Sequence, residues 1–141
     1  MYEPPGALRT TFPARPEGLI ELHAAFDQFF AASATDGRPI GPQDQMAFLT
    51  AAAEVASNIV DHACHGAPDA CVHLALARHS SSMEARFEDS GVAWGEAIAD
   101  PTNPIPHMGL GLLVARACLD QLDYERMGDL NRWTLLKQLS P

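Results

Sequence analysis

One helical segment, which runs to about Gly66, carries an apolar stripe beside a separate polar stripe, and this pattern constrains the fold most. At about 100° per residue, one face of this helix holds Phe48, Ala52, Val55 and Ile59. A second face, well to one side, holds Glu54, Asn58, Asp61 and His65. The first face predicts contact with a core. The second is typical of the solvated side of an amphipathic helix, so a site here needs support from elsewhere in the chain.

The composition predicts one compact domain over residues 1–141. Hydrophobic residues make up 47% of the chain and charged residues 19%, which is a globular composition and not a disordered one. The formal net charge of -9 argues against broad electrostatic binding to nucleic acid or to an anionic membrane, since both rely on clustered Lys and Arg. An acidic surface of this kind favours a basic protein partner.

The sequence predicts a cytoplasmic protein. It has no run of about 18 apolar residues, and its start, Met1 to Gly6, lacks the basic and apolar regions of a signal peptide. The odd number of cysteines, Cys64, Cys71 and Cys118, fits reduced thiols better than a disulfide framework.

Hydrophobic periodicity and turn residues predict an alternation of strands and helices. Strands are expected at residues 8–12, 70–77, 83–88, 123–126 and 132–138. Helices are expected at residues 16–34, from the turn at 37–42 to Gly66, and at 110–122. The strands at 70–77 and 83–88 should form a hairpin. The proline-containing loop at 91–107 is long for a compact domain, and long ordered loops often cover sites.

Two further motifs carry chemistry. Asp89-Ser90-Gly91 follows a predicted strand, where a carboxylate can point into a pocket and a glycine lets backbone approach a ligand. Gly109 and Gly111 lie where the proline loop opens into a helix, whose free N–H groups can receive phosphate oxygens. A dinucleotide fingerprint is a poor match, because Val114 stands where its third glycine belongs.

Taken in order, these segments resemble the four boxes of the GHKL, or Bergerat-fold, family of histidine kinase-like ATPases. The match is with bacterial anti-sigma factors that are serine-protein kinases. The boxes are Glu54…Asn58, Asp89-x-Gly91, Gly109-x-Gly111 and the final strand from Asn131 to Lys137. The resemblance implies a two-layer α/β sandwich with a mixed, mostly antiparallel sheet and helices on one face. It also implies an ATP lid at about residues 91–108.

The resemblance also implies roles for particular residues. Asn58 would be the magnesium ligand, since Mg²⁺ takes oxygen ligands. Glu54 would be the catalytic residue that orients or deprotonates a serine hydroxyl. Asp89 would accept a hydrogen bond from the exocyclic amine of adenine, with Gly91 beside it and Thr134 supporting the base. The remaining nucleotide-binding residues would be Asp61, His62, His107, Met108, Gly109, Leu110, Gly111 and Leu112.

The partners implied by the resemblance are a sigma factor and an antagonist protein that carries the substrate serine. Family members commonly form homodimers. The chain departs from the family pattern at Ala93, where another glycine is frequent, and at His107-Met108, where Gly-Arg precedes the paired glycines. Fewer glycines and one cation less in the lid weaken nucleotide binding or stabilisation of the γ-phosphate.

Three other interpretations stay open. His62, Cys64, His65, Cys71 and His73 are dense enough to suggest zinc, although they lack paired Cys-x-x-Cys arms. A non-enzymatic module with this fold would sequester a transcription factor by surface contact alone. The catalytic domain of a histidine kinase shares the fold, but little sequence precedes residue 8 for a dimerising phosphoacceptor helix pair.

Overall fold

The structure is a computed structural model, and it describes residues 7–67, 69–94 and 108–141. Its strands are β1 (Leu8–Pro13), β2 (Cys71–Arg78), β3 (Ser82–Asp89), β4 (Gln121–Met127) and β5 (Leu130–Gln138). Its helices are α1 (Leu19–Thr35), α2 (Pro42–Asn58) and α4 (Met108–Cys118), with a 3₁₀ turn η1 (Pro16–Gly18) and a π-helical turn η2 (Ile59–Ala63).

The strands form one sheet in the order β1-β2-β3-β5-β4. Both β2–β3 and β4–β5 are hairpins, and β5 lies between β3 and β4. All four pairings among these strands are antiparallel, so the described residues show none of the parallel pairing that a mixed sheet implies. The hairpin expected from the sequence between residues 70 and 88 is confirmed.

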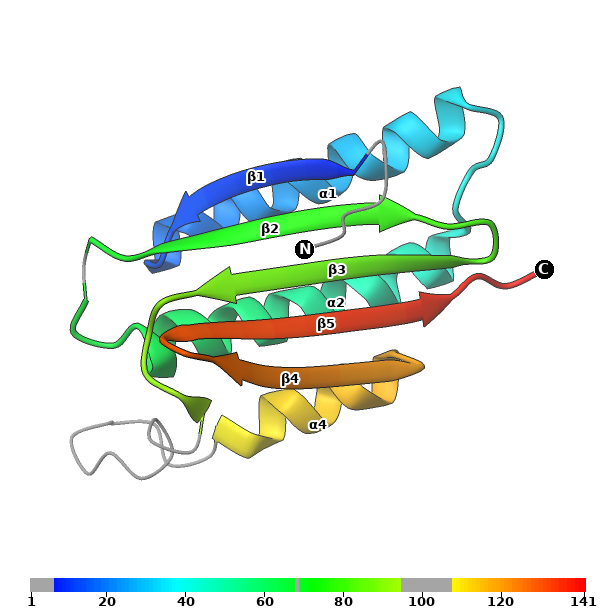
Figure 1. The fold of residues 1–141 in the computed structure, drawn as a ribbon. Helices are drawn as coiled ribbons and strands as arrows, with labels where there is room; N and C mark the ends of the chain where they lie inside the picture. The colour runs from blue at the N-terminus through cyan, green and yellow to red at the C-terminus, as the bar shows by residue number, and fades with distance from the viewer. Residues whose placement is uncertain (1–6, 68, 95–107) are drawn as a thin grey trace.

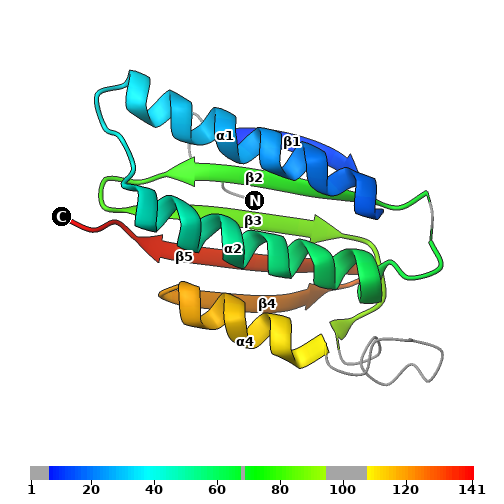
Figure 2. The ribbon, with the colours of Figure 1, turned by 180° about the vertical axis from the view of Figure 1, so that it is seen from behind.

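The helices α1, α2 and α4 all cover the same face of the sheet, and the opposite face carries no helix among the described residues (Figures 1 and 2). The expected two-layer sandwich with helices on one face is therefore confirmed. Helix α2 lies behind the middle of the sheet, between α1 and α4, so it packs against the sheet and against both neighbouring helices.

The core lies between the helices and the sheet. The expected apolar stripe of α2 is confirmed: Phe48, Ala52, Val55 and Ile59 are each fully buried. Phe48 packs against the ring of Phe26 on α1, with the ring centroids 5.4 Å apart. On the sheet, alternate residues of β3 face the helices, as the period of two in a strand requires. These residues are Met83, Ala85, Phe87 and Asp89.

Several boundaries differ from those expected. The helix bearing Glu54 leaves regular α-helical geometry at Asn58, and the π-helical turn η2 follows it. Helix α4 ends at Cys118 instead of about 122, because Leu122 belongs to β4, where it pairs with Leu135 of β5. Of the expected lid at 91–108, residues 95–107 lie outside the described part of the chain.

None of the helices in the described residues combines the length and the hydropathy that crossing a bilayer requires.

Removal of the Phe48 ring tests the core. Phe48→Ala is expected to lower the free energy of unfolding by about 3–5 kcal/mol, because the cavity at a fully buried site collapses only in part. Met46→Ala on the same helix is the matched control: its side chain is 72% exposed, so the loss should stay below about 0.5 kcal/mol. Urea denaturation measures both, and equal losses would contradict this account of the core.

Candidate functional site

Three chain segments meet at one end of the molecule. They are the end of α2 with η2, the end of β3, and the first turn of α4 (Figure 1). The segments that the sequence analysis singled out around Asn58, Asp89 and Gly111 therefore lie near one another, although up to 53 positions separate them along the chain, from 58 to 111.

Asp89 is the buried acid of this region, with only 1% of its surface exposed. Its Oδ1 accepts hydrogen bonds from the Gly91 N–H at 2.8 Å and from Asn131 Nδ2 at 2.9 Å. Its Oδ2 is also buried, and no group of the described residues hydrogen-bonds to it. Burial raises the pKa of Asp89 above its ordinary value, and the hydrogen bonds to Oδ1 oppose the rise. One oxygen of this carboxylate thus remains available to a ligand.

Cys64 contacts the same oxygen of that carboxylate. Its thiol donates to Asp89 Oδ1 at a sulfur–oxygen distance of 3.8 Å, a weak bond. Burial raises the pKa of Cys64 to about 12, and the negative charge of Asp89 adds to the rise. The thiol therefore stays protonated at neutral pH and is a poor nucleophile and a poor metal ligand.

Gly91 is required by a close approach of two backbone segments. A Cβ at this position would lie 2.3 Å from the carbonyl oxygen of Ala63, the last residue of η2. That same oxygen accepts a hydrogen bond from the Val92 N–H at 2.9 Å. In the structure this glycine lets the chain after β3 approach the end of the helix, and its expected approach to a ligand stays a prediction.

The π-helical turn makes that carbonyl available. In η2 the Cys64 N–H donates to Ile59 O at 2.9 Å, five residues back, so the chain unwinds at the end of α2. Ala63 O then bonds to the chain after β3 instead of continuing a helical ladder. The turn thus joins the helix layer to the sheet layer beside Asp89.

Glu54 and Asn58 lie on the side of α2 that faces α4. A Cβ on Gly111 would stand 2.6 Å from Glu54 Oε2, so the first turn of α4 packs directly on this carboxylate. Asn58 is only 6% exposed, and its buried Oδ1 has no hydrogen-bond partner among the described residues. A solvated helix face does not explain a buried, unsatisfied amide oxygen, whose burial costs about 1–3 kcal/mol.

The other residues expected on the phosphate side lie close by in the chain. Asp61 and His62 belong to η2, where Asp61 is half-buried and His62 is buried. Met108, Gly109, Leu110, Gly111 and Leu112 form the first turns of α4, which confirms that the paired glycines open a helix. Leu110 is exposed and Leu112 half-buried. His107 lies outside the described residues.

Thr134 is not brought to this group, and this corrects its expected place beside the adenine. Directly paired residues of antiparallel strands share a face, and Thr134 pairs with Arg86 of β3 and with Asp123 of β4. It therefore lies on the face of the sheet opposite that of Asp89. The residue of β5 paired with Asp89 is Asn131.

Asn131 and its neighbours are site residues that the sequence analysis missed. Besides Asp89, the Asn131 amide donates to Val92 O at 2.9 Å, and its Oδ1 accepts from the Tyr124 hydroxyl at 2.6 Å and from Arg126 Nη1 at 3.1 Å. Arg126 Nη1 also donates to Gly91 O at 2.7 Å. This network fixes the backbone after Asp89. One signal in the sequence could have indicated Asn131: it is a polar residue at the start of the last strand, within the run Gly128 to Asn131.

Among the residues the structure describes, no group of three or more His, Cys, Asp or Glu side chains is arranged to hold a metal ion. Cys64 is buried against Asp89, whereas Cys71 is exposed on β2.

The fold and these contacts define a class of protein, a two-layer α/β domain with a site at one end. Three parts form this site: a helix that carries Glu and Asn, a buried Asp at the end of a strand, and the start of a helix that contains glycines. The family model of the histidine kinase-like ATPase domain matches residues 12–137. The chain therefore belongs to the family of histidine kinase-like ATPase domains.

A solved structure shows the same fold. The crystal structure of the RsbU and RsbW domains of Rv1364c from Mycobacterium tuberculosis matches this chain with a TM-score of 0.65 at 20% sequence identity. The match covers 98% of this chain and 34% of that chain, so this chain spans about a third of its length. Comparison with curated proteins found no match.

The raised pKa of Asp89 has a measurable consequence. The pKa of Asp89 in the folded state exceeds its ordinary value of 3.8. The contribution of Asp89 to stability is therefore fully present below pH 3.8 and is lost as the pH rises through the folded-state pKa. Asp89→Asn keeps the acceptor oxygen for the Gly91 N–H and removes this dependence. The wild type should lose stability relative to Asp89→Asn as the pH rises.

Urea denaturation of both proteins between about pH 3 and pH 7 measures this difference, since contributions of other carboxylates cancel in the comparison. A wild type that gains stability over the variant as the pH rises would show that the bonds to Oδ1 outweigh the cost of burial.

Proposed function

We propose that this chain binds ATP with Mg²⁺ and acts as a serine/threonine-protein kinase on an antagonist protein, thereby controlling a sigma factor. The observation that carries the proposal is a pair of buried oxygens without partners in the described structure, Asn58 Oδ1 and Asp89 Oδ2. They belong to the two residues to which the family resemblance assigns magnesium and adenine. Buried polar atoms are nearly always hydrogen-bonded, so two orphans in one region indicate a ligand.

The residues present fit this cofactor. A carboxamide oxygen is a suitable ligand for Mg²⁺, a hard cation that prefers oxygen. A buried carboxylate oxygen is a suitable acceptor for an exocyclic amine. The first N–H groups of α4 have no partner within the helix and lie at its positive end, so they suit phosphate oxygens. Absence of a side chain at Gly111 keeps this end of the helix close to Glu54.

When bound, Mg-ATP supplies the phosphoryl group and the cation that neutralises its charge. The role that we assign to Glu54 is to orient the serine hydroxyl of the protein substrate and to accept its proton. Glu54 is half-buried, and its contact with the first turn of α4 limits the positions that the carboxylate can adopt. Such positioning of a base is the main task of the protein in phosphoryl transfer.

The partners follow from the same resemblance: a sigma factor, and an antagonist that carries the serine. The chain contacts no nucleic acid or membrane in this proposal, which its net charge of -9 supports. Action in the cytoplasm and a homodimer are further parts of the proposal.

A second candidate function is sequestration of a protein partner without phosphorylation. It is favoured by apolar side chains on the outer side of α4. Leu110 is 60% exposed, Leu113 65% and Val114 38%, and their spacing of three and four residues places them on one stripe of the helix. Contiguous exposed apolar side chains commonly mark protein-binding surfaces. The substitutions at Ala93, His107 and Met108 favour the same candidate.

Asn58→Ala tests the cofactor site. Magnesium-dependent ATP affinity should fall by roughly tenfold or more, because the variant removes a metal ligand. The fold should persist, since Asn58 Oδ1 has no partner in the described structure. Ser57→Ala, the adjacent half-buried residue, is the control and should bind as the wild type does. Calorimetric titration with ATP and magnesium measures all three, and unchanged affinity in Asn58→Ala would remove the basis of the proposal.

Glu54→Gln separates the two candidate functions. The variant keeps the size of the side chain and loses the base, so ATP binding should persist while phosphorylation of a serine falls about 10²-fold or more. Incubation with radiolabelled ATP and candidate antagonists measures the transfer, and Glu17→Gln in the exposed η1 turn is the control. If the wild type binds ATP and forms no phosphoserine, sequestration becomes the better account.

A further inference from the structure

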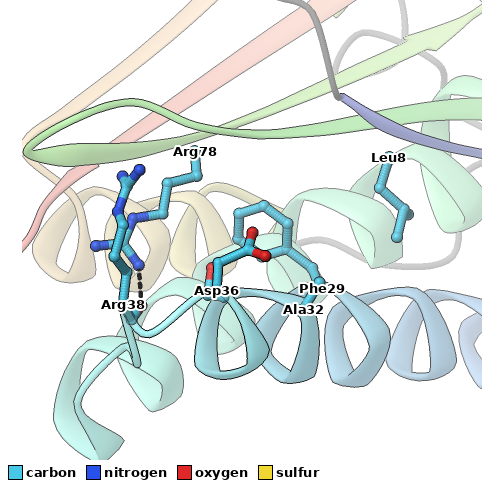
Figure 3. Close-up of a pocket in the computed structure, with 7 residues that line it drawn as sticks. Leu8, Phe29, Ala32, Asp36, Arg38 and Arg78 are labelled. Atoms are coloured by element: carbon cyan, nitrogen blue, oxygen red, sulfur yellow. Dashed lines mark hydrogen bonds between the residues drawn. The ribbon is translucent and has the colours of Figure 1, made fainter.

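A pocket lies at the end of the molecule opposite Asp89, where α1 ends and the hairpin between β2 and β3 turns (Figure 3). Its volume is about 310 Å³. The residues that line it are Leu8, Phe29, Ala32, Ser33, Asp36, Arg38 and Arg78. None of them has a part in the nucleotide site proposed above, so this pocket needs a separate explanation.

Two arginines form one side of the pocket and hold each other in place. Arg78 donates through Nη1 to the carbonyl oxygen of Arg38. Arg38 in turn donates through Nη2 to the carbonyl oxygen of His79, the residue after Arg78, at 3.1 Å. Figure 3 shows the two side chains next to each other at the same side of the pocket. These reciprocal bonds restrict the guanidinium groups before any ligand arrives.

Neither of these arginines forms an ion pair among the described residues. Neither guanidinium there lies within 4.0 Å of a carboxylate, although Arg86, Arg132 and Lys137 each have such a partner. The Nε of Arg78 is buried and has no acceptor in the described structure. Burial lowers the pKa of Arg78, and the nearby charge of Arg38 adds to the effect. Two adjacent cations without a counter-ion favour an anion between them.

A structural role at the end of α1 does not account for the arginines. The last carbonyl groups of this helix already accept backbone N–H groups: Ala32 O from Asp36, Ser33 O from Arg38 and Ala34 O from Gly37, all within 3.0 Å. The helix end is thus capped by its own backbone. Neither guanidinium is needed for that purpose.

The other residues that line the pocket limit which ligands fit it. Phe29, Leu8 and Ala32 provide an apolar surface of a size that suits one ring or a short alkyl chain. Asp36 also lines the pocket, and its carboxylate forms no ion pair with Arg38 or Arg78 within 4.0 Å. A ligand with a second negative charge near Asp36 would be repelled.

We propose that this pocket binds a small amphiphilic anion, whose single carboxylate or phosphate monoester group is held by Arg38 and Arg78 and whose apolar part rests on Phe29. Arginine suits both anionic groups because its planar fork can donate two parallel hydrogen bonds. This pocket and the proposed nucleotide site lie at opposite ends of the sheet.

The test is a titration of the full chain, labelled with ¹⁵N, with benzoate, phenyl phosphate and benzyl alcohol. Both anions should shift the amide signals of residues around Phe29 and Arg78, and the neutral alcohol should do so much more weakly. The anion that binds more tightly identifies the group that the arginines prefer. Shifts confined to the surroundings of Asn58 and Asp89 would place the anions at the other site and overturn the proposal.

Charge variants complete the test. Arg78→Gln should weaken binding of both anions roughly tenfold, through loss of a charged hydrogen bond. Arg15→Gln makes the same charge change outside the pocket and should leave the affinity unchanged. Asp36→Asn should tighten binding, and Asp27→Asn, exposed on the same helix, should not. Asp36→Asn keeps both arginines, so it remains informative if Arg78→Gln unfolds. Equal affinity in the wild type, Arg78→Gln and Asp36→Asn would overturn the proposal.

Discussion

The position of α2, covered by the sheet on one side and by α4 on another, determines most of what this structure can do. The apolar stripe of α2, including Phe48, Val55 and Ile59, is completely buried, and Phe48 also packs against Phe26 on α1. Asn58 is buried and Glu54 half-buried although both are polar, and the first turn of α4 packs on the Glu54 carboxylate. Burial of the stripe against the sheet offsets the cost of burying the amide. Stability of the layer packing thus supports a polar site that would not be stable by itself.

The sheet contributes the second half of the site through its register. Asp89 and Asn131 lie opposite each other on neighbouring strands, and their direct hydrogen bond continues into Tyr124 and Arg126 on the edge strand β4. Arg126 and Asn131 also hold the carbonyl oxygen of Gly91. The backbone that leaves β3 is therefore restrained from one side by β5 and β4, and from the other by the end of η2. Both layers meet at this short stretch of chain.

Local patterns predicted the fold well, because the elements here follow their usual periods. The spacing of Phe48, Val55 and Ile59 predicted the buried face of α2, and the strand patterns at residues 70–77 and 83–88 predicted the β2–β3 hairpin. The family resemblance supplied the layer arrangement. A local pattern does not contain the π-helical turn, whose last carbonyl oxygen, on Ala63, accepts a hydrogen bond from the Val92 N–H across the two layers.

The candidate site was predictable in part. Glu54, Asn58, Asp89 and Gly111 come together, whereas Thr134 lies on the other face of the sheet. A shift of one residue in the register of a strand moves every side chain to the opposite face, and nothing in the sequence of β5 alone determines that register. Asn131 was missed for the same reason, since only the pairing with β3 brings it to Asp89. The place of His107 stays a prediction.

The buried thiol beside Asp89 bears on how the protein responds to oxidants. Peroxide and electrophilic drugs attack thiolates, and a cysteine whose pKa is about 12 is almost entirely uncharged at physiological pH. Cys64 is therefore an unreactive buried thiol, although it lies beside the candidate site. Exposed Cys71 on β2 is the far better target for such reagents, followed by half-buried Cys118 on α4, so a maleimide dye can be attached outside the candidate site while Cys64 stays unmodified.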